Sequence, residues 1–133
     1  MKELRTEIEI QASPDKVWQV LTNLDKYPEW NPFIHHAVGK AKVGETVDLD
    51  FQSDSKGLKL HCVVITAEPN RELCWKYHVI HPGLFRGEHS FTIESLGNNR
   101  VRFIDREIFN GLLVPLQAKD IGLTQMPSEW QEI

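Results

Sequence analysis

The stretch 13-SPDKVWQVLTNLDKYPEWNPF-33 decides the fold, because in it a helical pattern runs directly into a turn that holds three aromatic residues and two prolines. Ser13 is a favourable helix N-cap, and Pro14 suits the first helical position. Apolar side chains then recur at helical spacing, at Val17, Trp18, Leu21 and Leu24. The helix must end before Pro28, since the residue that precedes a proline is pushed out of the α region. The stretch therefore predicts an amphipathic helix followed by a helical elbow.

Extended segments lie on both sides of this helix. Residues 4–11 alternate apolar and polar side chains, which predicts a half-buried strand. Six further stretches, separated by turn-forming residues, are also predicted as strands: 33–40, 45–52, 57–68, 72–80, 86–96 and 99–109. Strands at hairpin intervals favour an antiparallel meander, and their separation from the helices is typical of the α+β class. A short helix is expected at 112–121, and the whole chain, 1–133, is expected to form one domain.

The composition excludes several classes of partner. The formal net charge is -4 and the pI is near 5.8, with no cluster of basic residues, so a nucleic-acid partner is not expected. The N-terminus lacks the apolar run of a signal peptide, and no stretch is long enough to span a bilayer. Cys62 and Cys74 form neither a disulfide framework nor a zinc motif. We therefore expect a cytoplasmic protein with no membrane span.

The hairpin around Pro69 and Asn70 sorts its side chains by polarity. With these residues as a two-residue turn, one face becomes almost wholly apolar. Its expected cross-strand pairs are Leu60–Val79, Cys62–Tyr77, Val64–Trp75 and Thr66–Leu73. Cys74 then pairs with Ile65 on the other face, so Cys62 and Cys74 should point apart and should not bridge.

The next hairpin brings polar groups onto an aromatic face. A three-residue loop at 97–99 gives the expected pairs His89–Glu107, Phe91–Asp105 and Ile93–Phe103. One imidazole and two carboxylates then lie on the same side of the sheet. A tighter two-residue turn would direct the acids outward. We prefer the first register because it leaves Arg102 and Arg106 in solvent.

Taken together, these segments resemble the START-like (SRPBCC) superfamily, and within it the polyketide cyclase/dehydrase branch. The resemblance lies in the opening strand with the SPDKVWQVLTNLDKYPEWNPF stretch, and in the later segments EPNRELCW, GEHSFTIES and RFIDREIFNGLL. It covers roughly residues 4–116. It implies a helix-grip fold, in which a bent antiparallel sheet of about seven strands closes around a long C-terminal helix. A cavity for apolar or amphipathic small molecules would lie between sheet and helix.

The resemblance also implies where a ligand would lie. Four residues would form the elbow that seals one end of the sheet: Trp18, Tyr27, Trp30 and Phe33. Six would line the cavity: Trp75, Tyr77, His89, Phe91, Phe103 and Glu107. The strand patterns and the apolar segment at 111–116 add further candidate ligand contacts: Phe51, Cys62, Asp105 and Leu112.

The C-terminal segment departs from the family pattern. Only 22 residues follow Gly111, and Gly122 and Pro127 interrupt them, so the helix that normally closes the cavity would be short. Three explanations stay open: an unusually open pocket, a second subunit that closes it in a homodimer, or a shortened form of the domain.

The histidines do not predict a metal site. The chain has six of them, but His35 and His36 are neighbours on a predicted strand and would point to opposite faces. No zinc-binding spacing is present, and neither a P-loop nor a dinucleotide fingerprint occurs. We expect neither a metal nor a cofactor.

Three functions from different classes fit these patterns. The first is binding of a hydrophobic or aromatic small molecule, with His89 and Glu107 orienting a polar group of the ligand. The second is a cyclase or dehydratase that uses His89 and Glu107 as an acid/base pair. The third is a protein–protein module of the co-chaperone type, with 111–116 as its contact surface. The orienting role is preferred over catalysis because apolar pockets commonly carry a few such polar groups.

Overall fold

The computed structural model describes residues 1–30, 34–53, 56–78, 81 and 83–111, and their side chains except at 30, 51–53 and 56–58. The chain begins with strand β1 (Lys2–Ile10) and helix α1 (Pro14–Thr22). A 3-10 turn (Leu24–Lys26) and the short helix α2 (Tyr27–Trp30) follow. Six strands come next: β2 (Ile34–Gly39), β3 (Thr46–Ser53), β4 (Lys56–Glu68), β5 (Glu72–His78), β6 (Arg86–Gly97) and β7 (Arg100–Asn110).

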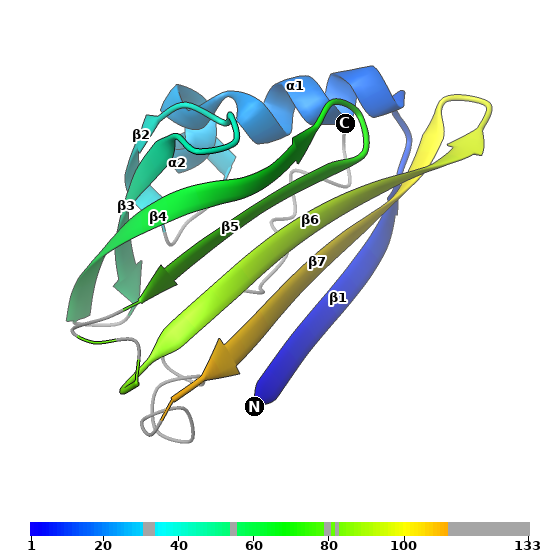
Figure 1. Ribbon diagram of the computed structural model, residues 1–133. Helices are drawn as coiled ribbons and strands as arrows, with labels where there is room; N and C mark the ends of the chain where they lie inside the picture. The colour runs from blue at the N-terminus through cyan, green and yellow to red at the C-terminus, as the bar shows by residue number, and fades with distance from the viewer. Residues whose placement is uncertain (31–33, 54–55, 79–80, 82, 112–133) are drawn as a thin grey trace.

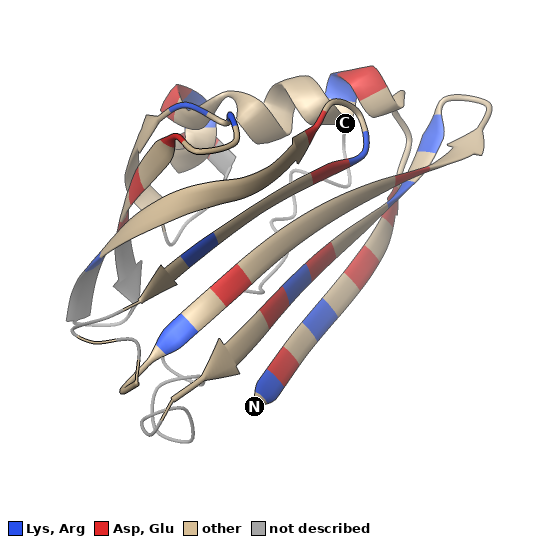
Figure 2. Ribbon diagram, in the orientation of Figure 1, with Lys and Arg blue, Asp and Glu red and all other residues tan. Residues whose placement is uncertain are grey.

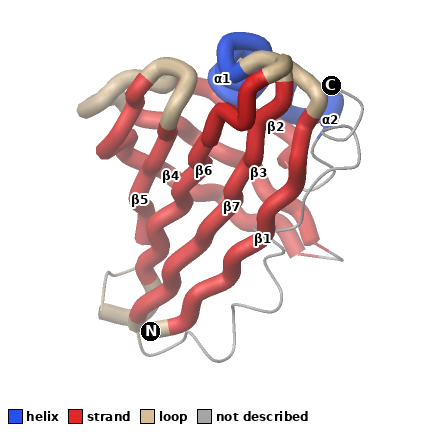
Figure 3. The backbone as a smooth tube through the Cα atoms, turned by 90° about the vertical axis from the view of Figure 1, so that its right-hand side faces the viewer, coloured by secondary structure: helices blue, strands red, loops and turns tan. Residues whose placement is uncertain are grey.

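The strands form one antiparallel sheet of seven, in the order β1-β7-β6-β5-β4-β3-β2. Each strand from β2 to β7 pairs with its neighbour in sequence, whereas β1 pairs with β7 along its whole length, from Lys2↔Phe109 to Ile10↔Val101. The sheet curls, and α1 crosses one end of it (Figure 1; Figure 3). This arrangement confirms the predicted α+β class and the helix-grip fold. The short helix expected at 112–121, and any dimer contact made through it, lie outside the described residues.

The opening helix begins and ends where the sequence predicts. The Ser13 hydroxyl accepts a hydrogen bond from the Lys16 amide at 3.2 Å, as an N-cap does. The helix ends at Thr22, before Pro28, which lies in the first turn of α2. Tyr27 is buried and its hydroxyl donates to the carbonyl of Leu21, so the elbow is tied back to α1. The elbow packs on β2, and α1 contacts β6.

The core lies on the concave side of the sheet, because alternate side chains of each strand point there. In β7, for example, every second residue from Val101 to Phe109 is buried. The residues between them, which include Arg102 and Arg106, reach the outer face. Figure 2 shows charged residues as bands along β1 and β7; in β7 the acids, Asp105 and Glu107, face inward, whereas the arginines face outward. The concave side is thus apolar apart from a small polar group described below.

The β4–β5 hairpin has the predicted register in its body but not at its turn. Val64 pairs with Trp75, as expected. The turn, however, has three residues, 69–71, closed by Glu68↔Glu72, and a bulge at Ile65 takes up the extra residue. Thr66 therefore pairs with Cys74 instead of Leu73, so the expected pairs Thr66–Leu73 and Cys74–Ile65 were both wrong. Cys62 and Cys74 are both free, as predicted.

In the β6–β7 hairpin the turn is shorter than expected, and a bulge again makes up the difference. Its turn is the tight one, Asn98–Asn99, closed by Gly97↔Arg100, where a three-residue loop was expected. A bulge at Leu96 then shifts the register by one residue. The body of the hairpin pairs as predicted: His89↔Glu107, Phe91↔Asp105 and Ile93↔Phe103. The two acids therefore face inward.

A bulge also changes the surroundings of the adjacent histidines. The β2–β3 register shifts between Ile34 and His36, so the strict alternation assumed for this strand does not hold. Both His35 and His36 are exposed, while Ile34 and Ala37 are buried. The expectation that His35 and His36 point to opposite faces rested on an unbroken strand, which is absent here.

Candidate functional site

Three neighbouring strands bring the polar residues of the concave face together. Each row across β5, β6 and β7 takes one residue from each strand: Tyr77–Gly87–Phe109, Trp75–His89–Glu107 and Leu73–Phe91–Asp105. His89 therefore lies opposite Glu107 and one row from Asp105. His89, Asp105 and Glu107 are also the polar or charged residues that are buried in the described part of the chain.

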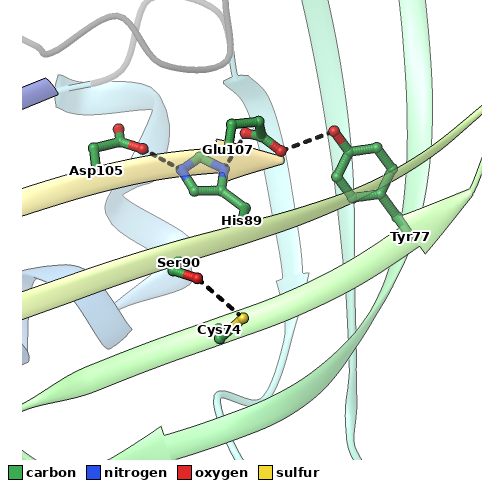
Figure 4. A network of polar contacts seen from close by, with 6 residues as sticks. All are labelled: Cys74, Tyr77, His89, Ser90, Asp105 and Glu107. Carbon is green, nitrogen blue, oxygen red and sulfur yellow. Dashed lines mark hydrogen bonds and ion pairs between the residues drawn. The ribbon is translucent and has the colours of Figure 1, made fainter. Parts of the chain in front are cut away.

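The imidazole of His89 lies between two carboxylates (Figure 4). Its Nε2 is 2.6 Å from Oδ1 of Asp105, and its Nδ1 is 2.7 Å from Oε1 of Glu107. The Tyr77 hydroxyl donates to Oε2 of Glu107 at 2.9 Å. The contact of Oε1 with Nδ1 is an ion pair without hydrogen-bond alignment, so Oε1 has no hydrogen-bond donor among the described residues. We call these four residues the polar network.

Gly87 provides the space through which Tyr77 reaches the network. It lies directly opposite Tyr77, and a Cβ at this position would be 2.4 Å from the Cζ and hydroxyl oxygen of Tyr77. Such a contact is far inside van der Waals distance. A strand-interior glycine commonly marks close approach of another group, and here that group is the Tyr77 ring on its way to Glu107.

The ionisable groups of the polar network are buried, and their pKa values are shifted. Burial alone lowers the pKa of His89, but Glu107 and Asp105 more than offset this and raise the pKa from 6.5 to about 10. Burial raises the pKa of Glu107, and His89 and the Tyr77 hydroxyl only partly oppose it. Burial, and then Glu107, raise the pKa of Tyr77 well above 10. At neutral pH His89 is therefore an imidazolium and Tyr77 a neutral donor.

Aromatic rings surround the imidazolium. Phe91 stacks on His89 with ring centroids 4.2 Å apart, and Trp75 meets His89 edge-on at 5.9 Å. Trp75 also contacts Phe91 at 5.4 Å, and Phe103 stacks on Phe91 at 5.9 Å. The rings fix the orientation of the imidazole and exclude water from it. The result is an aromatic face with one charged centre.

The structure unites most of the predicted site residues. Eight of them lie on the concave face of β4 to β7: Cys62, Trp75, Tyr77, His89, Phe91, Phe103, Asp105 and Glu107. Trp18 is only partly buried and lines a surface groove of about 580 Å³ between α1, residues 39–43 and the β4–β5 turn. The side chains of Trp30, Phe33, Phe51 and Leu112 lie outside the described part, so their predicted contacts stay predictions.

Sequence reasoning missed Gly87 as a member of the site. The sequence pattern does not define the β5–β6 register, so it does not place Gly87 opposite Tyr77. The available signal was a glycine inside a strand of otherwise large alternating residues. The role of Asp105 as the second carboxylate on His89 was also unassigned, although the predicted hairpin register had turned it inward.

Two other findings bear on the kind of protein this is. In the part of the chain that the structure describes, no three His, Cys, Asp or Glu side chains are grouped to hold a metal ion. Among the described helices, none is both long and apolar enough to cross a membrane.

A family model identifies the family. The model of the family "Polyketide cyclase / dehydrase and lipid transport" matches residues 1–120, so the chain belongs to this family. A search of curated proteins returned no match.

Solved structures share the fold at low sequence identity. A START superfamily protein from Mycobacterium smegmatis is 19% identical, with a TM-score of 0.67 over 79% of this chain and 74% of that one. Norcoclaurine synthase from Thalictrum flavum is 14% identical, with a TM-score of 0.66 over 90% and 91%. StfQ, a di-domain ARO/CYC protein of the steffimycin biosynthetic pathway, is 16% identical, with a TM-score of 0.70. The alignment with StfQ covers 92% of this chain but only 41% of the two-domain protein. These likenesses show that the chain shares the fold of these proteins.

Proposed function

We propose that the protein binds a hydrophobic or aromatic small molecule against the concave face of its sheet, with the polar network as the anchor for one polar group. The observation that carries this proposal is a charged, buried network on a face that is otherwise aromatic and aliphatic. Buried charges cost free energy unless they are paired, and apolar ligand sites typically hold a few such groups to orient the ligand.

The residual exposure of the site supports the same proposal. His89, Phe91 and Tyr77 keep 6%, 6% and 5% exposure, whereas Trp75 behind them has 1%. These two rings and the imidazole therefore keep a small exposed area, whereas Trp75, beside His89, keeps almost none. A flat aromatic body on this surface would contact the rings of Phe91 and Tyr77.

Binding of Nile red, a neutral apolar dye, tests the proposal. We expect its fluorescence to rise on titration with the protein, and the Phe91→Ala variant to bind about tenfold more weakly, since a lost aromatic contact is worth 1 kcal/mol or more. Val38→Ala, at an exposed position outside the concave face, is the control and should bind as the wild type does. If both variants bind like the wild type, the concave face is not the site.

An acid/base enzyme is the second candidate, and the buried Glu107 with its raised pKa favours it. In this alternative the His89 imidazolium donates a proton and the Glu107 carboxylate accepts one, as cyclisation or dehydration requires. The ARO/CYC fold relative supports the class of reaction. The variant His89→Gln separates the candidates. A binder keeps most of its affinity, whereas an enzyme loses turnover by orders of magnitude while it still binds. The co-chaperone-type alternative depends on residues 111–116, of which only Gly111 is described.

A further inference from the structure

The concave face carries an unbalanced negative charge. Two carboxylates, Asp105 and Glu107, face one imidazolium, His89, so the network as a whole has an excess of one negative charge when both acids are ionised. Tyr77 donates a hydrogen bond but adds no positive charge. No lysine or arginine belongs to the buried residues that the structure describes.

The two arginines that neighbour Asp105 along β7 lie on the wrong side of the sheet to balance this charge. Arg102 and Arg106 alternate with Asp105 along β7, and alternate side chains of a strand point to opposite faces. Both arginines already form ion pairs on the outer face. Arg106 Nε is 2.8 Å from Glu3, and Arg102 is 3.9 Å from Glu94. Lys2 of β1, opposite Phe109, shares the inner face, but no ion pair joins it to the polar network in the described part of the chain.

One acceptor atom of the network is also incomplete. Oε1 of Glu107 belongs to a side chain with 0% exposure, and no described residue donates a hydrogen bond to it. Its contact with His89 Nδ1 is close but misaligned, and Tyr77 serves the other oxygen, Oε2. Buried carboxylate oxygens normally have aligned donors, because an unmet one costs free energy. This carboxylate oxygen thus lacks an aligned donor among the described residues.

The aromatic rings beside the network add a further preference. Phe91 stacks on the imidazolium, Trp75 meets it edge-on, and Phe103 stacks on Phe91. The π faces of such rings attract cations and repel anions. A ligand whose polar end is an anion would meet both the excess carboxylate and the rings.

From these features we infer that the site selects ligands whose polar end is a protonated amine on an aromatic or aliphatic body, and that it rejects carboxylates such as fatty acids. The ammonium is attracted to the excess negative charge of Asp105 and Glu107 and supplies the missing positive charge, while the apolar body lies on the rings. This inference rests on the proposed function, because it names the class of ligand for the same face.

Three probes with one common aromatic body test it: 2-naphthylmethylamine, 2-naphthalenemethanol and 2-naphthoate, titrated at pH 7 by isothermal calorimetry. The wild-type protein should bind the ammonium about tenfold or more tightly than the alcohol, and the carboxylate most weakly, since one partly buried ion pair is worth over 1 kcal/mol. In Glu107→Gln the ammonium should lose this advantage and bind about as the alcohol does. Glu94→Gln, a carboxylate of the same strand pair on the outer face, is the matched control and should keep the order.

The outcomes separate the inference from the function on which it rests. If the alcohol or the carboxylate binds as tightly as the ammonium, the inference is overturned and the binding function stands. If none of the three binds, the proposed function fails as well. Should Glu107→Gln not fold, Asp105→Asn removes the other carboxylate and must abolish the ammonium preference in the same way; a preserved preference in it would contradict the inference.

Discussion

At the scale of single residues, the site depends on the absence of a side chain at position 87. Gly87 has no Cβ, and this lets the Tyr77 ring cross β6 and donate to Glu107. The hydrogen bond in turn fixes the carboxylate that contacts His89. The Glu107 carboxylate is thus held in position because Gly87, which has no functional group of its own, leaves room for the Tyr77 ring.

The substitution Gly87→Ala should therefore disturb the network without straining the backbone, because Gly87 does not have a positive φ. The new Cβ would displace the Tyr77 ring and break its bond to Glu107. We expect a loss of about 1–3 kcal/mol in the free energy of unfolding, as overpacking typically costs. Urea denaturation measures it.

A second background shows whether Tyr77 is the cause. In Tyr77→Leu, which removes the ring, the same Gly87→Ala change should cost much less, so the two substitutions should be strongly non-additive. Additive costs would mean that Gly87 matters for some reason other than the Tyr77 contact.

At the scale of elements, the two central hairpins show what a sequence pattern can and cannot predict. Polarity alternation fixed the body of each hairpin correctly, because a slip by one residue would bury arginines and expose phenylalanines. Both turn lengths were wrong by one residue. The bulges at Ile65 and Leu96 absorbed the error, since a bulge adds one unpaired residue to one strand.

Bulges of this kind leave no pattern in the sequence that polarity can reveal. The inward-facing acids were therefore predictable, whereas the turn types were not. The contact of Tyr77 with Glu107 was also out of reach, because it depends on the relative placement of β5 and β6, two strands joined by a longer connection.

The tight turn at Asn98–Asn99 makes a prediction at this scale. Both residues have positive φ, 54° and 55°, which suits glycine and asparagine and opposes β-branched residues. Asn99→Gly should be neutral or slightly stabilising, whereas Asn99→Val should cost about 1–2 kcal/mol in the free energy of unfolding. Chemical denaturation of the two variants compares them. A valine variant as stable as the wild type would show that the turn relaxes to a longer loop.

At the scale of the whole molecule, the network ties stability to pH. The pKa of His89 is raised in the folded protein to about 10 from 6.5, so the folded state binds this proton more tightly than the unfolded state does. The resulting stabilisation is complete below pH 6.5 and is lost as pH rises toward 10. The raised pKa of Glu107 acts in the same direction, because a carboxyl that is buried without full compensation also favours folding in its protonated form.

We therefore expect the free energy of unfolding to fall between pH 6.5 and about 10, by several kcal/mol at roughly 1.4 kcal/mol per unit of pKa difference. Urea denaturation across this range measures the slope. The double variant His89→Gln/Glu107→Gln should lose most of it. His61→Gln, which changes an exposed histidine that pairs with Asp48 on the outer face, should keep it. Equal slopes in the wild type and the double variant would contradict the charge state assigned to the network.

The pairing of β1 with β7 also determines the order in which the strands of the sheet can pair. The partners in this ladder lie about a hundred residues apart, for example Lys2 and Phe109, and all the other strands form between them. On the ribosome, β1 emerges early and has no partner until β7 has left the exit tunnel. The backbone groups of β1 must stay solvated during that time, and closing so large a loop is slow. Every second residue of β1 is charged: Glu3, Arg5, Glu7 and Glu9. These charges protect the unpaired β1 from pairing with another chain before β7 is available.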